Sequence, residues 1–184
     1  MEPADVLMKI IKERRSIRRY TDEKISDELV QKFLEAARWA PSAGDIQAWE
    51  FIVIRDENVK EQLYHAALRQ LYIKEAPVVI AVCANQKRSG RFYRGRGYNL
   101  FCYQDSAAAI QNMLLIIHAN GYGAVWIGAF NDAKVAEILK TPEGIRPIAI
   151  IPIGRPAEQP SPTPRYKLKK VTHVNQYGNK TFFK

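Results

Sequence analysis

The segment Gln104–Ala119, QDSAAAIQNMLLIIHA, decides how this chain folds. Between Ala107 and Ile117 the only polar residues are Gln111 and Asn112, which leaves a helix almost no polar face. A helix that is apolar all round has to be buried on all sides. In a chain of 184 residues, the burial that fits best lies between a β-sheet and a partner subunit. The segment therefore predicts a helix at a subunit interface.

Apolar runs on either side of this helix predict a sheet. Trp49–Ile54 (WEFIVI) is a strand, and Pro77–Cys83 (PVVIAVC) has the continuous apolar pattern of a strand buried on both faces. Pro147–Gly154 (PIAIIPIG) predicts a further buried strand, and Gly121–Ile127 predicts a turn that enters a strand.

Apolar periodicity and capping residues predict four further helices. Ser26 and Asn131 are candidate N-caps for two of them, and Pro41 ends one. The helices are expected at Val6–Arg14, Glu28–Trp39, Asn58–Arg69 and Asp132–Leu139. Strands alternate with helices, but the chain begins with two helices. The predicted class is therefore α+β, a central mixed β-sheet flanked by helices, in one domain spanning residues 1–184.

Composition excludes several classes of protein. Hydrophobic residues make up 47% and charged residues 26%, an ordinary globular balance. No apolar run is long enough to span a bilayer, and the N-terminus lacks the apolar region of a secretory signal. Cys83 and Cys102 stand in no metal-ligand spacing and are expected to be small core residues. We expect a cytoplasmic protein without membrane contact.

The net charge of +9 is concentrated in two segments. Residues 85–99 hold five cations and no acid, and the tail after Gln159 holds six cations and no acid. These cations are Lys87, Arg88, Arg91, Arg94 and Arg96, then Arg165, Lys167, Lys169, Lys170, Lys180 and Lys184. Such patches attract the phosphates of a nucleic acid, a nucleotide cofactor or a phosphorylated substrate, or they serve solubility. The distribution of charge alone does not distinguish between these functions.

Three segments are candidates for a binding site. In Arg14–Arg18 (RRSIR), residues 14, 16 and 18 face the same way if the chain is extended, and a guanidinium fork suits phosphate oxygens. Ala40–Trp49 (APSAGDIQAW) is rich in small residues that let the backbone approach a flat ligand. Gly121–Phe130 (GYGAVWIGAF) leaves Gly128 where a backbone amide can face a cofactor. Taken singly, they equally fit a charged helix end, a connecting loop and a glycine-bounded buried strand.

The order of these motifs resembles the nitroreductase family. RRSIR is followed by APSAGDIQAWEF, EAPVVIAV, an alanine-rich helix ending in HANGYGAVWIG, and IPIGRP before a basic tail. Each motif is weakly specific, but the match covers nearly the whole chain in the right order. The resemblance implies an intertwined homodimer with the central helix in its interface. It also implies two FMN sites, each built from both chains.

Carried over by position, the resemblance assigns residues to the cofactor. Arg14, Arg15 and Ser16 would hold the FMN phosphate and ribityl chain, joined by Arg165 from the basic tail. Arg18 would approach the pyrimidine edge, where a positive charge stabilises the anionic reduced flavin. Gln70 resembles an amide residue that bonds the ring or ribityl chain.

The same resemblance places the flavin ring between two segments. Along the ring would lie Val125, Trp126, Ile127 and Gly128, with the Gly128 N–H near N5. The other subunit would contribute Pro41, Ser42, Ala43 and Gly44. Two departures stand in that second segment: Asp45 where asparagine is common, and Ala48 where proline is usual. The chain is also short, so only residues 85–99 replace the helical excursion that covers the flavin in larger members.

The implied function is ping-pong hydride transfer from NAD(P)H through FMN N5 to a nitroaromatic, quinone or related small acceptor. The flavin carries the chemistry, so no catalytic side chain and no metal is required. His65, His118 and His173 show no triad or metal spacing. The basic segments lean towards NADPH. Two alternatives remain: a flavin-binding or flavin-processing relative without reductase activity, and a basic nucleic-acid-binding module, for which no recognition motif is visible.

Overall fold

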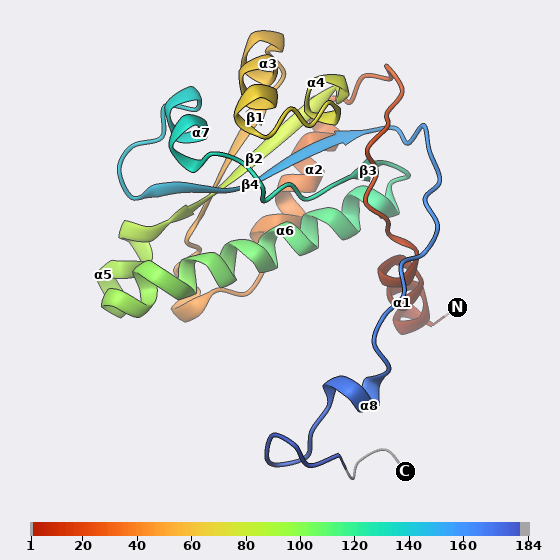
Figure 1. The fold of residues 1–184 in the computed structure, drawn as a ribbon, viewed down its shortest axis with the longest axis vertical. Coiled ribbons are helices and arrows are strands. Elements are labelled where there is room, and N and C mark those ends of the chain that lie inside the picture. Colours follow the sequence, from red (N-terminus) through yellow and green to blue (C-terminus); the bar gives the residue numbers. More distant parts are fainter. Residues whose placement is uncertain (1, 181–184) are drawn as a thin grey trace.

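The computed structural model describes residues 2–180 and contains a sheet of four strands in the order β1-β2-β4-β3 (Figure 1). The strands are β1 (Trp49–Ile54), β2 (Val78–Asn85), β3 (Gly123–Ala124) and β4 (Ile145–Gly154). All neighbouring strands pair antiparallel. One parallel bridge, between Ser16 and Ala124, extends the sheet at the β3 edge and makes it mixed there. The predicted α+β class is confirmed.

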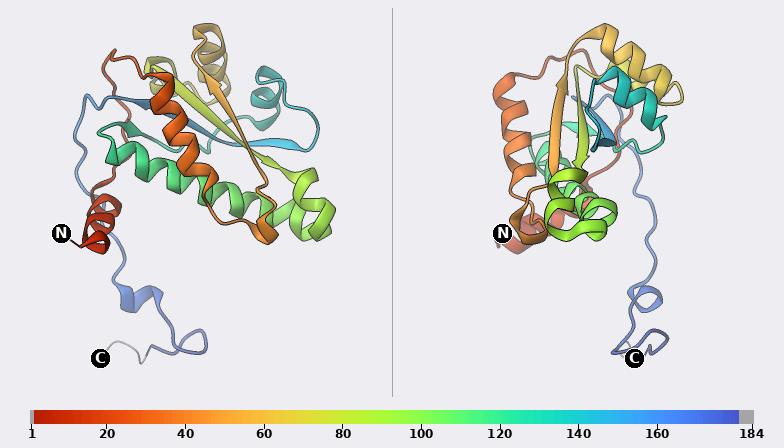
Figure 2. Two further views of the ribbon diagram at one scale, coloured as in Figure 1. Left: turned by 180° about the vertical axis from the view of Figure 1, so that it is seen from behind. Right: turned by 90° about the vertical axis from the view of Figure 1, so that its left-hand side faces the viewer.

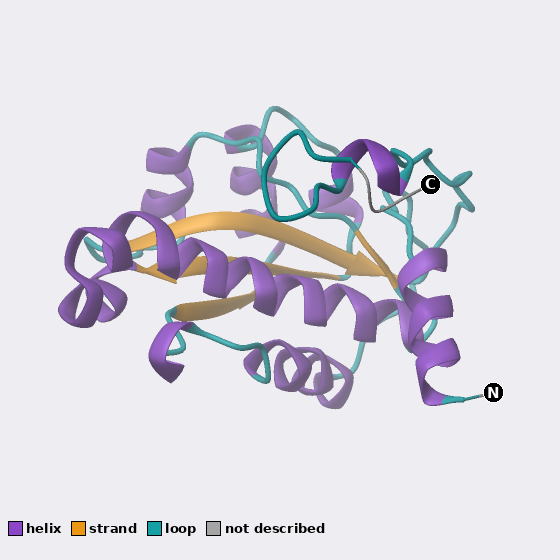
Figure 3. Cartoon of the chain, turned by 90° about the horizontal axis from the view of Figure 1, so that it is seen from below, coloured by secondary structure: helices purple, strands orange, loops and turns teal. Residues whose placement is uncertain are grey.

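Strand β2 divides the apolar interior into two cores because its side chains alternate between the faces of the sheet. Val78, Ile80 and Val82 belong to one core, with residues of α2 (Asp27–Arg38) and α6 (Cys102–Ala119). Val79 and Ala81 belong to the other. That second core is covered by α3 (Glu57–Ala66), α4 (Tyr72–Glu75) and α7 (Asp132–Ile138). Figures 2 and 3 show the helices on both sides of the sheet, with α6 running across it.

Helix α6 is the expected long apolar helix and begins two residues earlier than predicted. Ala109, Ile110 and Met113 are fully buried against the sheet and α2. Its other side is only half-buried within one chain, at Ala107, Ala108, Leu115 and Ile116. The helix therefore keeps an apolar stripe that its own chain does not cover.

Most expected boundaries lie within a few residues of the observed ones. Ser26 caps α2 by accepting from the Leu29 amide at 3.3 Å, and Asn131 caps α7 by accepting from Lys134 at 3.0 Å. Helix α1 (Pro3–Glu13) replaces the expected Val6–Arg14.

Two expectations about element length were wrong. The helix expected to reach Arg69 ends at Ala66, because Leu68 and Arg69 both adopt a φ of +57° that no α-helix accommodates. The strand expected within Gly121–Ile127 is only Gly123–Ala124. Ile127 then pairs with Ile150 as an isolated bridge.

The two basic segments take different forms. The first folds as α5 (Gln86–Arg96), followed by a short π-helix, η2 (Gly97–Phe101). The second leaves the body after β4 and contains only the four-residue helix α8 (Leu168–Val171), as Figure 1 shows. Lys184 lies outside the described residues. Within residues 2–180, no helix is long and apolar enough to cross a membrane, and no group of His, Cys, Asp or Glu side chains could hold a metal ion.

Candidate functional site

Two of the three candidate segments lie side by side at the β3 edge of the sheet. The amide of Ile17 donates to the Ala124 carbonyl at 3.0 Å, next to the Ser16–Ala124 bridge. Ile127 exchanges two backbone hydrogen bonds with Ile150, each 3.0 Å long. The segment 125–128 is therefore fixed between residues 16–17 on one side and β4 on the other.

Side chains alternate in and out along residues 125–128. Val125 and Ile127 are buried in the core beneath α3 and α7, at 3% and 2% exposure. Trp126 is 39% exposed, and Gly128 is exposed. A flat ligand on this surface would meet the Trp126 ring and the backbone of the segment, and not the side chains of Val125 and Ile127.

Gln70 lies beside the end of the same segment. Its side-chain amide donates to the carbonyls of Ala67 at 2.8 Å and Ala129 at 3.1 Å, and its oxygen accepts from the Tyr72 hydroxyl. The predicted residue is therefore next to the candidate surface, but its polar atoms are engaged within the chain.

Three guanidinium groups gather where α1 ends. Burial lowers the pKa of Arg14, and the positive charges of Arg15 and Arg165 lower it further. The Arg15 and Arg165 side chains donate only to backbone carbonyls and the Thr163 hydroxyl. Among residues 2–180, none of the three arginines has an acidic partner. An uncompensated cluster of this kind suits a phosphate.

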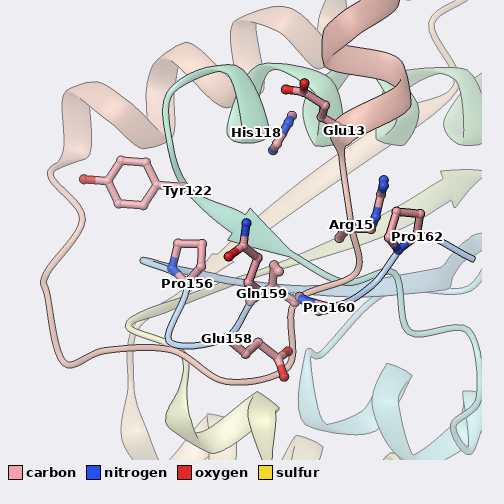
Figure 4. A pocket seen from close by; sticks show the side chains of 10 residues that line it. Glu13, Arg15, His118, Tyr122, Pro156, Glu158, Gln159, Pro160 and Pro162 are labelled. Atoms are coloured by element: carbon pink, nitrogen blue, oxygen red, sulfur yellow. The ribbon is translucent and has the colours of Figure 1, made fainter.

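A pocket of about 680 Å³ opens beside this cluster (Figure 4). Arg15, Tyr122 and His118 line it, with the chain from Pro156 to Pro162 on the opposite wall. Burial lowers the pKa of His118, and nearby Glu13 partly opposes that effect.

Arg18 has an acidic neighbour that sequence reasoning missed. Its backbone amide donates to the carboxylate of Glu158, and both residues line a second hollow of about 890 Å³. The Arg18 side chain is exposed. Glu158 therefore offsets part of the positive potential that Arg18 creates.

The third candidate segment lies elsewhere in the chain, at the amino end of α6. The Ala43 amide donates to Asp105 Oδ1 at 3.0 Å, which holds the loop Pro41–Gly44 against the first turn of that helix. Gly44 has a φ of +58°, and a Cβ on it would lie 2.5 Å from the Tyr93 hydroxyl oxygen. Only glycine fits this position without displacing Tyr93.

Asp105 is a second residue that sequence reasoning missed. It is 5% exposed, its Oδ2 has no partner in the described part of the chain, and burial raises its pKa. The signal was present in the sequence, since Asp105 is the only acid in the apolar helix.

The departures Asp45 and Ala48 have different settings. Asp45 is exposed with a φ of +55° and accepts from Gln47 Nε2 at 3.1 Å. Ala48 is fully buried, and its carbonyl accepts from the Asn85 amide at 2.9 Å and from Ser106 Oγ at 3.3 Å.

The two groups of candidate residues stand at opposite ends of α6 (Figure 1). That helix has 18 residues. At 1.5 Å per residue it is about 27 Å long, too far for one ligand to reach both ends. Residues 14–18 and 125–128 can join residues 41–44 in one site only if the latter come from a second copy.

The cysteines take no part in this arrangement. Cys83 and Cys102 are both free and buried. Burial raises the pKa of Cys83 to about 12, so at neutral pH its thiol is not a nucleophile.

The fold and these surfaces define an α+β protein with a candidate mononucleotide-binding site, and comparison with known proteins identifies the family. The model of the nitroreductase family matches residues 11–74 and 65–155. The chain therefore belongs to the nitroreductase family.

Named relatives and solved structures agree with that membership. The chain is 31% identical to an NADH dehydrogenase of Thermus thermophilus, over 86% of this chain and 90% of the relative. It is 28% identical to an FMN reductase [NAD(P)H] of Bacillus subtilis, over 94% and 75%. Its structure resembles that of the NADPH:FMN oxidoreductase of Vibrio harveyi in complex with NAD⁺. The TM-score is 0.86 at 28% identity, covering 93% of this chain and 77% of the other.

Proposed function

We propose that this protein is an FMN-dependent NAD(P)H oxidoreductase that reduces small nitroaromatic, quinone or related acceptors as a homodimer. The observation that carries the proposal is the group of Arg14, Arg15 and Arg165, which form no ion pair among residues 2–180, near the exposed Trp126 and Gly128 in a chain of this family. The donor set fits the phosphate of a mononucleotide. The strip beside it offers a flat surface and a backbone amide to a ring.

Each part of the candidate site has a task in this proposal. Arg14, Arg15 and Arg165 bind the FMN phosphate through charge-assisted hydrogen bonds, and Ser16 adds a neutral donor. Arg18 places positive charge at the pyrimidine edge. The amide of Gly128 would lie near N5, and Trp126 would flank the ring. When bound, FMN supplies the capacity to accept and donate a hydride, so no acid, base or nucleophile of the chain is needed.

A second copy completes the site. The loop Pro41–Gly44 comes from the partner, because within one chain it lies at the far end of α6. Two apolar surfaces are available for the association. One is the half-buried stripe of α6, and the other is α1, which has no buried residue and exposes Val6, Leu7, Met8 and Ile11 by 39–52%.

The test is an absorbance spectrum followed by an anaerobic titration. The purified protein should show flavin bands that bleach on addition of NADH or NADPH and return when a quinone is added. Stable flavin bands that neither nucleotide bleaches would favour a flavin-binding relative without reductase activity. A colourless protein that retards DNA would support the nucleic-acid alternative instead.

A further inference from the structure

The helix α5 presents a basic face that the proposed flavin site does not use. Lys87, Gly90 and Arg91 follow the spacing i, i+3, i+4, so they lie on one side of the helix, and Arg94 joins them at the point where the helix is interrupted. With Tyr98 they line a pocket of about 470 Å³.

The second wall of the pocket is η2, which folds back on α5. A Cβ on Gly97 would lie 2.3 Å from the Ser89 carbonyl oxygen, so only glycine permits this close approach. Tyr98 then packs against Gly90, where an added Cβ would sit 3.5 Å from its ring. The close packing of η2 on α5 therefore gives the pocket its shape.

The positive charges in the pocket are hardly paired with acids of the described residues. Arg91 and Arg94 take part in none of the ion pairs of residues 2–180, and Lys87 meets Glu143 only at 3.5 Å. By contrast, Arg88, which does not line the pocket, is paired with Glu50. The pocket thus concentrates positive charge beside an aromatic ring.

Arg94 is held in a conformation that favours glycine. Its φ is +49° and its ψ is −133°, and the helix is interrupted there. A non-glycine residue in such a region is strained, and strained residues cluster at ligand sites. The next residue is Gly95, so the sequence has a glycine beside the strained position and not at it.

The helix that carries the pocket also contacts the loop proposed to line the flavin. Arg88 Nη1 donates to the Gln47 carbonyl at 2.7 Å, and Tyr93 contacts the place where Gly44 lacks a side chain. Arg88 and Tyr93 lie on the other side of α5 from the pocket, so a ligand bound beside Pro41–Gly44 reaches the pocket only by extending across the helix, a diameter of about 10–12 Å.

We infer that Lys87, Arg91, Arg94 and Tyr98 bind the phosphate monoester of an aromatic ligand of the reaction. The inference rests on the proposed function and names the substrate class for it. Two ligands of such an enzyme carry this chemistry: NADPH through its 2′-phosphate, and a phosphorylated acceptor such as free FMN. Arginine forks bind a phosphate dianion, and the tyrosine ring stacks on the attached aromatic group.

The test variant is Arg91→Gln/Arg94→Gly, which removes both charges and relieves the strained backbone. The control is Lys24→Gln/Lys134→Gln, because these two lysines are exposed and appear in no ion pair of the described residues. Calorimetric titration of the flavin-loaded protein with 2′-AMP and with adenosine needs no turnover. The parent and the control should bind 2′-AMP at least about tenfold more tightly than the variant does. Adenosine should not distinguish the three proteins.

Steady-state kinetics then separate the two sources of phosphate. If the 2′-phosphate is bound, the variant's KM should rise about tenfold for NADPH and stay constant for NADH. If the acceptor is bound, KM should rise for FMN and stay constant for riboflavin. Equal 2′-AMP affinity in the variant and the parent overturns the inference, and so does lost 2′-AMP binding without any change in KM. A parent that binds 2′-AMP but is not reduced by either nucleotide would refute the proposed function and leave the phosphate pocket standing.

Discussion

Replacing Arg14 by glutamine removes one charge from a cluster whose three arginines form no ion pair among residues 2–180. A charge-assisted hydrogen bond contributes about 1.5–3 kcal/mol, and each 1.4 kcal/mol is a factor of ten in affinity. Arg14 is half-buried, so solvent screens it less than an exposed arginine. The dissociation constant for FMN should therefore rise by a factor of about 10 to 100. Riboflavin, which lacks the phosphate, should bind the variant and the parent equally.

The same substitution should act in the opposite direction on the flavin-free protein. Burial lowers the pKa of Arg14 most, and the positive charges of Arg15 and Arg165 lower it further, so these two arginines repel Arg14. Removing one of three like charges relieves this repulsion, so the unfolding free energy of the apoprotein should stay constant or rise. An arginine whose task was structural would give a loss of stability instead.

Flavin fluorescence titrations of the apoprotein measure the first effect, and thermal denaturation without flavin measures the second. Arg38→Gln is the matched control, since Arg38 is a surface arginine paired with Glu35 at 2.5 Å. Loss of that exposed pair should leave both the stability and FMN binding nearly unchanged. Equal losses for FMN and riboflavin in Arg14→Gln, or a destabilised apoprotein, would refute the phosphate assignment.

Three further substitutions test other parts of the structure. Ile11→Asp, on the exposed apolar face of α1, should weaken self-association at least tenfold in sedimentation, because a buried isoleucine contributes about 1.5–3 kcal/mol; unchanged association would place the interface elsewhere. Gly44→Ala should lower the unfolding free energy by about 1–2 kcal/mol through its positive φ and the contact with Tyr93, and a neutral effect in denaturant titration would contradict the loop geometry. Burial raises the pKa of Asp105, so its contribution to stability is lost as pH rises through the folded-state value. Asp105→Asn should then be more stable than the parent at pH 7, and the difference should vanish in acid; a less stable variant at pH 7 would show that a cation pairs with this carboxylate.

The apolar elements could be predicted from the sequence because their signal is local. Strand β1 has the predicted bounds, and α6 differs only at its start. The basic excursion α5–η2 could not be predicted, because its polar residues carry no apolar periodicity. The early end of α3 depends on positive φ values at Leu68 and Arg69. Neither a leucine nor an arginine in a sequence predicts a positive φ.

The site was harder to predict because it depends on distant residues. That Arg165 approaches Arg14 follows from the path of the chain after β4 and was expected only through the family resemblance. The sequence also did not predict that the side chains of Val125 and Ile127 are buried. The isolated bridge between Ile127 and Ile150 sets the direction in which these side chains point. The sequence also could not show which residues of the apolar helix α6 face their own chain: Ala109 and Met113 are buried in its core.

The separation of Arg14 and Gly44 by the length of α6 makes a prediction in genetic terms. In a two-fold symmetric dimer, each active centre would take Arg14 from one polypeptide and the Gly44 loop from the other. In a mixed dimer of an Arg14 mutant and a Gly44 mutant, one active centre would then contain both substitutions and the other would contain neither. Random pairing of the two mutant polypeptides would restore about a quarter of the centres. Two inactive alleles of this gene should therefore complement each other when expressed together, and two alleles altered in the same half should not.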